Sequence, residues 1–300
     1  MDDFKGKTAF ISGGASGIGL AMAKQFLGAG MQVIIADIRQ EALNNAVAAL
    51  NGGPLVRALM LDVTDRKNWT IVSDEIDQID IVCSNAGVFL GGPAQDATYD
   101  DWDFVLGVNL QGTINCIQTF VPRMIKQKTG GHIVLTSSIN GLFQSGGAAV
   151  YTASKFAVTG LGESLRVNLA PHNIGVSLLH PGPVATGLFE STPQVRPKNL
   201  RHTGAYAVKL DSSDPVSSEI FATAMPPDEV GRKVLAGIRR NDLYIITHGE
   251  IRAVLEARAK ALIAALPDEP IPPVRAKGAA TLYSDAVYRE QIAKPAPKPQ

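Results

Sequence analysis

The residues best suited to chemistry are a tyrosine and a lysine four positions apart, Tyr151 and Lys155, with Ser138 thirteen residues before the tyrosine. At the start of a segment with helical periodicity, this spacing places the tyrosine and the lysine on one face. A tyrosine has an ordinary pKa of about 10, and it becomes a base near neutral pH only if that pKa falls by about three units. A lysine ammonium a few ångströms away lowers the pKa in this direction. The three residues therefore predict proton transfer to and from a small substrate.

A second group of candidate residues forms a glycine-rich turn. Residues 12–19 read SGGASGIG, they follow a run typical of a strand, and a helical segment begins within them. Glycines at such a turn let the backbone approach a pyrophosphate, whose charge is stabilised by the free amide groups of the helix N-terminus. The glycines Gly13, Gly17 and Gly19 therefore predict a dinucleotide site, although glycine spacing alone is weak evidence and a plain turn is the alternative.

Asp37 stands about 20 residues after this turn, at the predicted end of the second strand, where a carboxylate accepts hydrogen bonds from the ribose hydroxyls of a dinucleotide. A 2′-phosphate about 4 Å away would be repelled by about 4 kcal/mol at an effective dielectric constant of about 20. The sequence therefore favours NAD over NADP. Arg39 offers a charge that pairs with a phosphate, but we expect an ordinary charge at the start of a helix.

The elements that position these residues alternate between short β-rich runs and longer helical segments from residue 7 to about residue 183. This alternation predicts a doubly wound α/β fold with a parallel sheet. Strands are predicted at residues 8–12, 33–37, 56–62, 79–84, 132–137 and 175–180, with helices at 17–27, 41–50, 69–77, 102–125 and 153–169. A helix from about residue 226 to 240, a strand at 243–247 and a helix at 250–266 are predicted to follow.

Two regions lack this rhythm. Residues 186–225 are rich in Ser, Thr, Pro and Gly without a sustained period, which is typical of a binding lid or of disorder. Residues 267–300 carry seven of the 18 prolines, and we expect extended packing or disorder there. The predicted organisation is a cofactor-binding and catalytic core at 1–186, a substrate loop at 187–226, a helix–strand–helix segment at 227–266 that completes the core, and a Pro-rich tail at 267–300.

Composition narrows the classes of function. The 300 residues are 45% hydrophobic and 19% charged, which predicts a globular chain with a large core. The 28 basic and 28 acidic side chains balance, so neither nucleic acid nor a membrane surface is expected as a partner. The two cysteines, Cys83 and Cys116, show no metal-binding or disulfide spacing, and no histidines pair at a metal spacing. Without a targeting segment, we expect a cytoplasmic protein that holds no metal.

The spacing of the glycine turn, G-x-x-x-G-x-G, resembles the cofactor-binding turn of the short-chain dehydrogenase/reductase family, with Ser12 in place of the usual Thr. Further matches follow in family order and at family spacing between about residues 7 and 186. They are Asp62-Val63, Ser84-Asn85-Ala86-Gly87, Val108-Asn109, Ser138, Tyr151-Thr152-Ala153-Ser154-Lys155 and Pro181-Gly182. The chain is identified as a member of this family, which implies a Rossmann-type fold in a single domain and a hydride-transfer reaction with NAD.

The resemblance implies the roles of individual residues. Tyr151 would be the acid and base, and Ser138 would hold the substrate oxygen. Lys155 would lower the pKa of Tyr151 and hold the nicotinamide ribose, while Asn109 would anchor a water chain to Lys155. Many NADP-using relatives have a basic residue at the position of Ser16, so Ser16 also supports NAD. The implied cofactor contacts are Gly13, Ser16, Gly17, Ile18, Gly19, Asp37, Asp62, Val63, Asn85, Ala86, Gly87, Tyr151, Lys155, Pro181, Gly182, Val184 and Thr186.

The substrate pocket of this family is formed largely after the cofactor strands, here by residues 187–225. The implied substrate contacts are Ser138, Phe143, Gln144, Leu188 and Phe189. A bulky, aromatic or apolar secondary alcohol or ketone fits such a long loop, and the C-terminal part resembles members that act on aromatic side-chain alcohols. A steroid-type hydroxy dehydrogenase and a ketoacyl reductase are alternatives within the family, and a non-enzymatic NAD-binding sensor or scaffold is the alternative of another class.

The two predicted helices at 102–125 and 153–169 have apolar residues around much of their circumference, which predicts burial beyond one face of the sheet. Members of the family associate through these two helices. The resemblance therefore implies a homodimer or a homotetramer.

Overall fold

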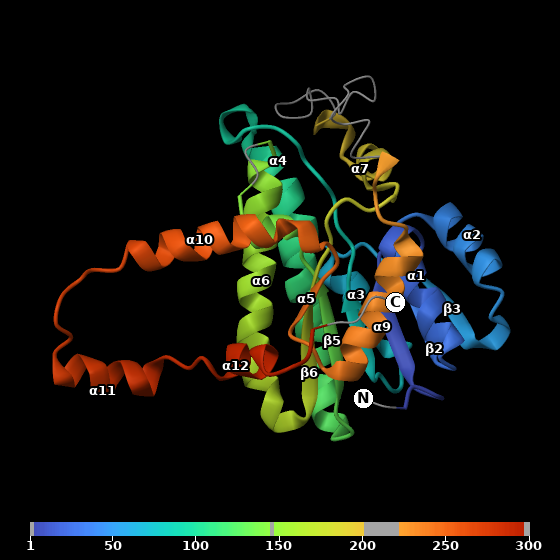
Figure 1. The fold of residues 1–300 in the computed structure, drawn as a ribbon. Coiled ribbons are helices and arrows are strands. Elements are labelled where there is room, and N and C mark those ends of the chain that lie inside the picture. Colours follow the sequence, from blue (N-terminus) through green and yellow to red (C-terminus); the bar gives the residue numbers. More distant parts are fainter. Residues whose placement is uncertain (1–2, 145–146, 201–221, 297–300) are drawn as a thin grey trace. The chain divides into compact units, whose positions relative to one another are not determined.

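The computed structural model describes residues 3–144, 147–200 and 222–296, and for residues 189, 190 and 199 it describes the backbone alone. The chain divides into two compact units, residues 1–247 and residues 248–300 (Figure 1). All of the catalytic, cofactor-binding and substrate-binding residues predicted from the sequence belong to the first unit.

The first unit is built around a parallel sheet of seven strands in the order β3-β2-β1-β4-β5-β6-β7. All but the first residue of β2 are buried, as expected of a strand that is covered on both faces. The chain order changes direction between β1 and β4, and doubly wound folds bind their ligands at the carboxyl ends of such strands. The strands are β1 (Thr8–Ser12), β2 (Gln32–Asp37), β3 (Val56–Met60), β4 (Ile81–Ser84), β5 (Gly131–Thr136), β6 (Ile174–His180) and β7 (Tyr244–Ile246).

Helices cover both faces of this sheet. On one face α1 (Gly17–Gly28) packs against α9 (Pro227–Arg240), beside α2 (Gln40–Leu50). On the other face lie α3 (Arg66–Asp74), α5 (Gly112–Gln127) and α6 (Ala149–Leu169). The short helix α4 (Tyr99–Leu106) leads into α5 through a π-helical turn, Gly107–Gln111. The sheet is thus the middle layer of three.

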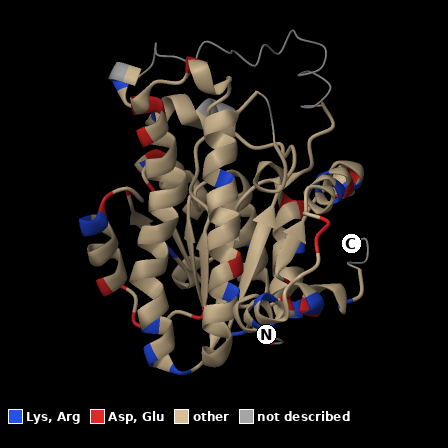
Figure 2. Ribbon diagram, turned by 90° about the vertical axis from the view of Figure 1, so that its left-hand side faces the viewer, with Lys and Arg blue, Asp and Glu red and all other residues tan. Residues whose placement is uncertain are grey.

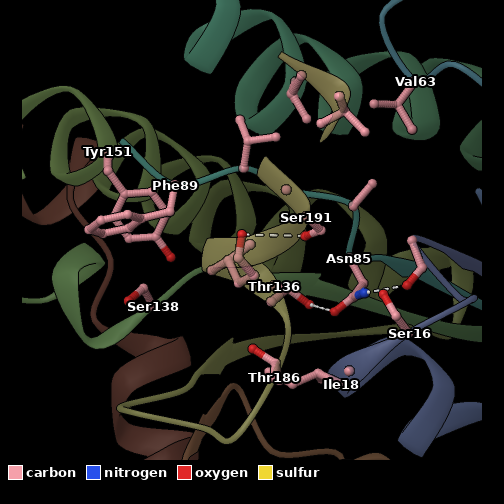
Figure 3. A pocket seen from close by; sticks show the side chains of 18 of the residues that line it. Ser16, Ile18, Val63, Asn85, Phe89, Thr136, Ser138, Tyr151, Thr186 and Ser191 are labelled. Carbon is pink, nitrogen blue, oxygen red and sulfur yellow. Dashed lines mark hydrogen bonds between the residues drawn. The ribbon is translucent and has the colours of Figure 1, made fainter. Parts of the chain in front are cut away.

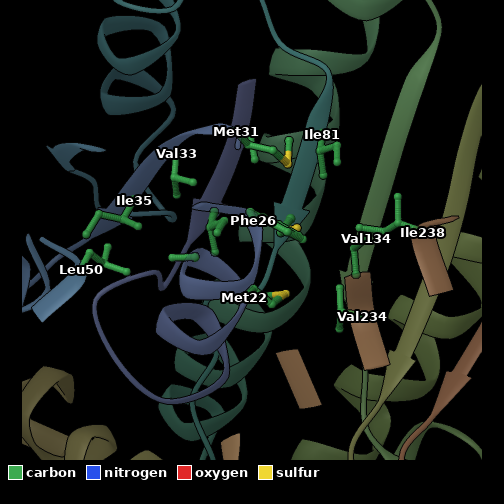
Figure 4. Packing of buried hydrophobic residues seen from close by; sticks show 14 of the residues in the cluster. Met22, Phe26, Met31, Val33, Ile35, Leu50, Ile81, Val134, Val234 and Ile238 are labelled. Atoms are coloured by element: carbon green, nitrogen blue, oxygen red, sulfur yellow. The ribbon is translucent and has the colours of Figure 1, made fainter. Parts of the chain in front are cut away.

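The two faces have separate apolar interiors. Under α1 and α9, the side chains of Met22, Phe26, Val234 and Ile238 pack on those of the central strands (Figure 4). On the opposite face, the rings of Phe10, Trp69 and Phe120 lie with centroids 4.8 to 6.1 Å apart. These interiors fix the strands whose carboxyl ends carry the candidate site residues.

The predicted Rossmann-type doubly wound sheet is confirmed, but several details of the prediction are wrong. The single helix predicted at 102–125 is broken by the π-helical turn. The segment 186–225, predicted without regular structure, contains α7 (Leu188–Val195) and a 3-10 turn, Lys198–Leu200; residues 201–221 lie outside the described part. The tail predicted to be extended contains α11 (Pro273–Leu282) and α12 (Ala286–Ile292), because its prolines precede α11, occupy its first position or follow α12.

The second unit consists of a 3-10 turn, Gly249–Ile251, and the helices α10 (Arg252–Ala264), α11 and α12. We expected α10 to complete the core together with α9 and β7. Instead it is grouped with residues 248–300, since none of its side chains is buried. The division of residues 1–226 into a core and a substrate loop stays a prediction.

Basic and acidic residues are both scattered over the described ribbon, in keeping with the zero net charge of the sequence (Figure 2). Within residues 3–144, 147–200 and 222–296, no helix combines the length and the apolar character needed to cross a membrane. In the same residues, His, Cys, Asp and Glu side chains form no group of three that could hold a metal ion.

Candidate active site

A cavity of about 960 Å³ lies at the carboxyl ends of the strands (Figure 3). Its walls include nearly all of the residues that the sequence predicts to contact a cofactor. Those that line it are Gly13, Ser16, Gly17, Ile18, Asp37, Asp62, Val63, Asn85, Ala86, Gly87, Tyr151, Lys155, Pro181, Gly182, Val184 and Thr186. The predicted cofactor contact Gly19 and the predicted catalytic residue Asn109 do not line the cavity. One continuous space therefore joins the predicted nucleotide site to the predicted catalytic residues.

The glycine turn is held by the strand beside it. The hydroxyl of Ser12, the residue in the usual threonine position, accepts hydrogen bonds from the backbone N–H groups of Asn85 (3.0 Å) and Ala86 (3.2 Å). The turn itself requires glycine: Gly13 has a φ of +63°, and a Cβ on Gly19 would lie 2.1 Å from the carbonyl oxygen of Gly13. No side chain caps the first amide groups of α1, which are suited to donate to a pyrophosphate.

Arg39 forms a polar cluster with Asp37 and Ser16 at the end of the cavity where the sequence predicts the ribose. Arg39 is therefore not the ordinary surface charge that we expected. The Arg39 guanidinium pairs with both carboxylate oxygens of Asp37, at 3.1 Å from Oδ1 and 3.3 Å from Oδ2. It also donates to the hydroxyl of Ser16 at 2.9 Å. All three side chains line the cavity. The positive charge offsets part of the repulsion that Asp37 would exert on a 2′-phosphate.

The predicted adenine contacts Asp62 and Val63 lie in the loop after β3, which ends two residues earlier than predicted. Asp62 Oδ1 accepts hydrogen bonds from the backbone N–H and the hydroxyl of Thr64. The carbonyl oxygen of Val63 accepts hydrogen bonds from Trp69 Nε1 and Asn115 Nδ2, both at 2.9 Å. Side chains of α3 and α5 thus hold this loop in place.

The reaction centre combines three buried side chains. Tyr151 and Lys155 share one face of α6, and Ser138 lies just after β5, near Tyr151 (Figure 3). Lys155 Nζ donates to the carbonyl oxygen of Thr136 at 3.0 Å and lies 5.5 Å from the centre of the Tyr151 ring. The ring of Phe89 packs on Tyr151 with centroids 4.9 Å apart (Figure 3). The structure therefore brings together the trio predicted from the sequence.

The pKa of Tyr151 is raised, whereas the sequence analysis expected Lys155 to lower it. Burial raises the pKa of this phenol to about 12, although the side chain of Ser138 acts in the lowering direction. Burial also lowers the pKa of Lys155 to about 8. Both shifts follow from the cost of placing a charge in an interior away from water. Lys155 alone does not bring Tyr151 to a pKa near neutrality, and a further positive charge is needed.

Ser138 is anchored from β6. The carbonyl oxygen of Ser138 lies 2.8 Å from His180 Nδ1, which must be the donor in this bond. Burial lowers the pKa of His180 to about 4, so the ring is neutral at neutral pH. The backbone N–H of Asn140 donates to the Ser138 hydroxyl at 3.1 Å.

Asn109 occupies the π-helical turn between α4 and α5, a kind of irregularity that is frequent at functional sites. Its side chain accepts from the backbone N–H of Val88 at 2.8 Å and donates to the Val88 carbonyl oxygen and the Ser154 hydroxyl, both at 3.0 Å. Ser154 in turn donates to the carbonyl oxygen of Tyr151 at 2.7 Å. Asn109 thus braces the first turn of α6, and its water chain to Lys155 stays a prediction.

The predicted substrate contacts divide into two sets. Ser138 and Leu188 line the cavity, whereas Phe143 and Gln144 do not, because the 3-10 turn Ile139–Gly141 brings other residues to its wall. The side chain of Phe189 lies outside the described part. Sequence reasoning missed Phe89, Phe104, Asp100, Asp103, Ile139 and Asn140, which also line the cavity. Ser191, Val195, Pro197 and Leu200 line it too, and they belong to the segment 187–225 that was predicted to form the substrate pocket. An aromatic residue directly after the Asn-Ala-Gly segment was a usable signal for Phe89.

The chain matches the family model described as short chain dehydrogenase over residues 7–196. It is 37% identical over 269 residues to the C alpha-dehydrogenase of Sphingobium sp. (strain NBRC 103272 / SYK-6), across 88% of this chain and 87% of the relative. The chain belongs to the short chain dehydrogenase family and is an oxidoreductase. The family predicted from the sequence is confirmed.

Two solved structures resemble the whole chain. A short chain dehydrogenase/reductase from Burkholderia phymatum in complex with NAD has a TM-score of 0.81 at 30% identity, covering 91% of this chain and 100% of its own. The apo form of LigO from Sphingobium sp. strain SYK-6 has a TM-score of 0.76 at 33% identity, covering 99% of this chain and 100% of its own. Both likenesses confirm the Rossmann-type fold.

Proposed function

We propose that the protein is an NAD-dependent dehydrogenase that oxidises a bulky, aromatic or apolar secondary alcohol to its ketone and catalyses the reverse reduction. The observation that carries this proposal is the single cavity of about 960 Å³, which joins the glycine turn and Asp37 to Ser138, Tyr151 and Lys155. The likeness to a C alpha-dehydrogenase supports alcohol oxidation, and the likeness to an NAD complex supports the cofactor.

The cofactor is NAD, and the residues present fit it. The turn leaves no room for side chains at Gly13 and Gly19, so a pyrophosphate can approach the backbone and the first amide groups of α1. Asp37 is placed to accept hydrogen bonds from the adenosine ribose, and Lys155 is placed to donate to the nicotinamide ribose. Residues 181–186, five of which line the cavity, are placed to receive the nicotinamide carboxamide.

NAD, when bound, supplies the acceptor for the hydride of the carbinol carbon. Tyr151 takes the alcohol proton on its phenolic oxygen during oxidation and returns it during reduction. The Ser138 hydroxyl holds the same substrate oxygen, and its proximity acts to lower the pKa of Tyr151. His180 fixes the backbone of Ser138, so the serine is positioned before substrate arrives.

Charge lowers the pKa of Tyr151 from its raised value. A positive charge about 5 Å away is worth about 3 kcal/mol at an effective dielectric constant of about 20, or about two pKa units. Protonated Lys155 supplies one such charge, and bound NAD would add the positive charge of its nicotinamide ring. The two charges would lower the pKa of the phenol from about 12 toward the neutral range, where a general base is most effective.

The substrate end of the cavity favours a bulky apolar molecule. Its walls carry aromatic and aliphatic side chains, and the Phe89 ring beside Tyr151 offers a surface on which an aromatic substrate can pack. The apolar members of this wall are Phe89, Phe104, Ile139, Leu188, Val195 and Leu200.

The experiment that tests the proposal is an assay of NADH formation with a panel of secondary benzylic, steroidal and small aliphatic alcohols. We expect kcat/KM to be highest for the benzylic compounds. A preference for steroids would favour the steroid-type alternative, and turnover of none of the alcohols or of the matching ketones would contradict the proposal.

The protein is proposed to act in the cytoplasm as a homo-oligomer. The apolar circumference of the segments that form α5 and α6 supports association through these helices. Sedimentation at micromolar concentration should show a species of at least twice the 31.7 kDa chain mass. A species of the chain mass alone would contradict the assembly.

A further inference from the structure

The helix α7 and the turn that follows it form part of the cavity wall, at the end proposed for the substrate. Leu188, Ser191 and Val195 of α7 line the cavity, as does Leu200 of the turn. The helix α4 also contributes to the wall of this cavity, through Asp100, Asp103 and Phe104. The distance between α7 and α4 therefore sets the width of the space that a substrate can occupy.

A buried ion pair joins the two sides of this wall. Arg196, the residue directly after α7, pairs through Nη2 with Oδ1 of Asp101 in the first turn of α4, and both side chains have an exposed fraction of 0%. Neither residue lines the cavity. The pair thus lies behind the wall, where it can act on a substrate only by positioning the residues that touch it.

Both partners of the pair are tied to the elements that they join. The second carboxylate oxygen of Asp101 accepts from the backbone N–H and the hydroxyl of Thr98, which caps α4. Arg196 Nε donates to the carbonyl oxygen of Leu200 at 2.7 Å, and the guanidinium carbon lies 5.9 Å from the centre of the Phe104 ring. The pair therefore fixes the start of α4, a cavity-lining ring and the turn after α7 in one arrangement.

A weaker contact holds the middle of α7. The backbone N–H of Phe89 donates to the hydroxyl of Thr192 at 3.1 Å, and that hydroxyl donates to the carbonyl oxygen of Leu188 at 2.8 Å. This contact involves one neutral hydrogen bond between segments. Separation of the ion pair would instead leave two charges without their partner in an apolar interior, which is far more costly.

We infer that Asp101 and Arg196 are positioning residues for the substrate: their ion pair holds α7 against α4 and thereby sets the affinity for bulky alcohols. This inference depends on the proposed function. A small alcohol that contacts only Ser138 and Tyr151 does not need the wall, whereas a bulky one does. The ion pair therefore controls the preference of the enzyme for bulky over small alcohols.

The test compares Arg196→Met, Arg196→Lys and Asp101→Asn with the unsubstituted enzyme. For the best benzylic alcohol of the panel, Arg196→Met should raise KM by at least about tenfold, since displacement of positioning groups by about 1 Å has effects of up to about 10². KM for a small aliphatic alcohol and the dissociation constant of NADH should change by less than about twofold. Arg196→Lys keeps the charge and should recover part of the loss, and Asp101→Asn, which keeps an acceptor for Thr98, should resemble Arg196→Met.

The matched control is Arg57→Met, which removes an exposed ion pair with Glu75 and should leave every constant unchanged. An unchanged KM for the benzylic alcohol in a folded Arg196→Met variant would overturn the inference and leave the proposed function standing. Equal losses for both alcohols, or failure of all three variants to fold, would also overturn it by assigning the pair a purely structural role. If the unsubstituted enzyme oxidises no alcohol with NAD, the proposed function itself fails.

Discussion

The cofactor end and the substrate end of the cavity are built in different ways. At the cofactor end a backbone turn makes most of the site, with glycines that tolerate no side chain and a serine hydroxyl that ties β1 to β4, beside the side chains of Asp37 and Arg39. At the substrate end side chains from α4, α6 and α7 make the site, and they meet only because the chain folds. A backbone site depends on local sequence, whereas a side-chain site depends on tertiary contacts. The same cavity can therefore keep one cofactor while its substrate changes.

The largest effect is expected from removal of the Tyr151 hydroxyl, which lies where the cofactor end and the substrate end of the cavity meet. Tyr151→Phe deletes one hydroxyl and leaves the ring against Phe89, so we expect kcat to fall by about 10² to 10⁴, the loss typical of a positioned proton-transfer group. The dissociation constant of NADH, measured by fluorescence, should hardly change. Near-normal turnover in this variant would show that the base lies elsewhere.

The elements at the cofactor end could be predicted from the sequence because each depends on a short stretch of chain. The turn at Gly13, Gly17 and Gly19 and the position of Asp37 follow from strand and helix patterns near them. Arg39 was misjudged, since its bond with Ser16 spans 23 residues and nothing in the local pattern indicates it.

Contacts at the substrate end could not be predicted in this way. Asp101 and Arg196 stand 95 positions apart, and each looks like an ordinary surface charge until α4 and α7 come together. Phe143 was placed in the pocket by resemblance to the family, but the 3-10 turn after Ser138 leaves it outside the wall. The tail was predicted to be extended or disordered because of its prolines, but no proline lies in the interior of α11 or α12.

The second test uses pH to probe how the substrate end is held. Burial, aided by the charge of Lys155, lowers the pKa of His180 to about 4, whereas the unfolded chain has the ordinary value of 6.5. Between these values the unfolded state binds a proton that the folded state does not, so the free energy of unfolding falls as the pH falls from about 6.5 to about 4. A difference of about 2.5 units corresponds to a loss of about 3 kcal/mol.

Urea unfolding across this pH range measures the effect. The variant His180→Asn keeps a donor for the carbonyl oxygen of Ser138 and should show a shallower pH dependence. The exposed His172→Gln is the control and should follow the unsubstituted protein. Identical slopes for His180→Asn and the unsubstituted protein would show that His180 does not titrate differently in the two states.

The third test concerns the charges at the cofactor end. The unsubstituted protein should bind NADH more tightly than NADPH. Asp37→Ala should lower the ratio of the NADPH to the NADH dissociation constant by at least about tenfold, or about 1.4 kcal/mol. The reason is twofold: the carboxylate no longer repels the 2′-phosphate, and Arg39 is released to pair with it. Arg39→Met should act in the opposite direction and raise this ratio. Equal dissociation constants for the two cofactors in the unsubstituted protein would contradict the assignment of Asp37.

The smallest change in KM is expected at Phe143. This residue gives the sharpest test because the sequence predicts that it contacts the substrate, whereas the structure leaves it outside the cavity wall. Phe89 packs on Tyr151 and lines the cavity, so Phe89→Ala removes an aromatic surface and should raise KM for a benzylic alcohol by about tenfold, in the range of a lost aromatic contact. Phe143 lies outside the wall, so Phe143→Ala should change KM by less than about twofold. Both variants lose the same ring, and melting curves separate a loss of stability from a loss of binding. An equal rise of KM in the two variants would mean that the residues after Ser138 do reach the substrate, and the substrate end would then be readable from the sequence after all.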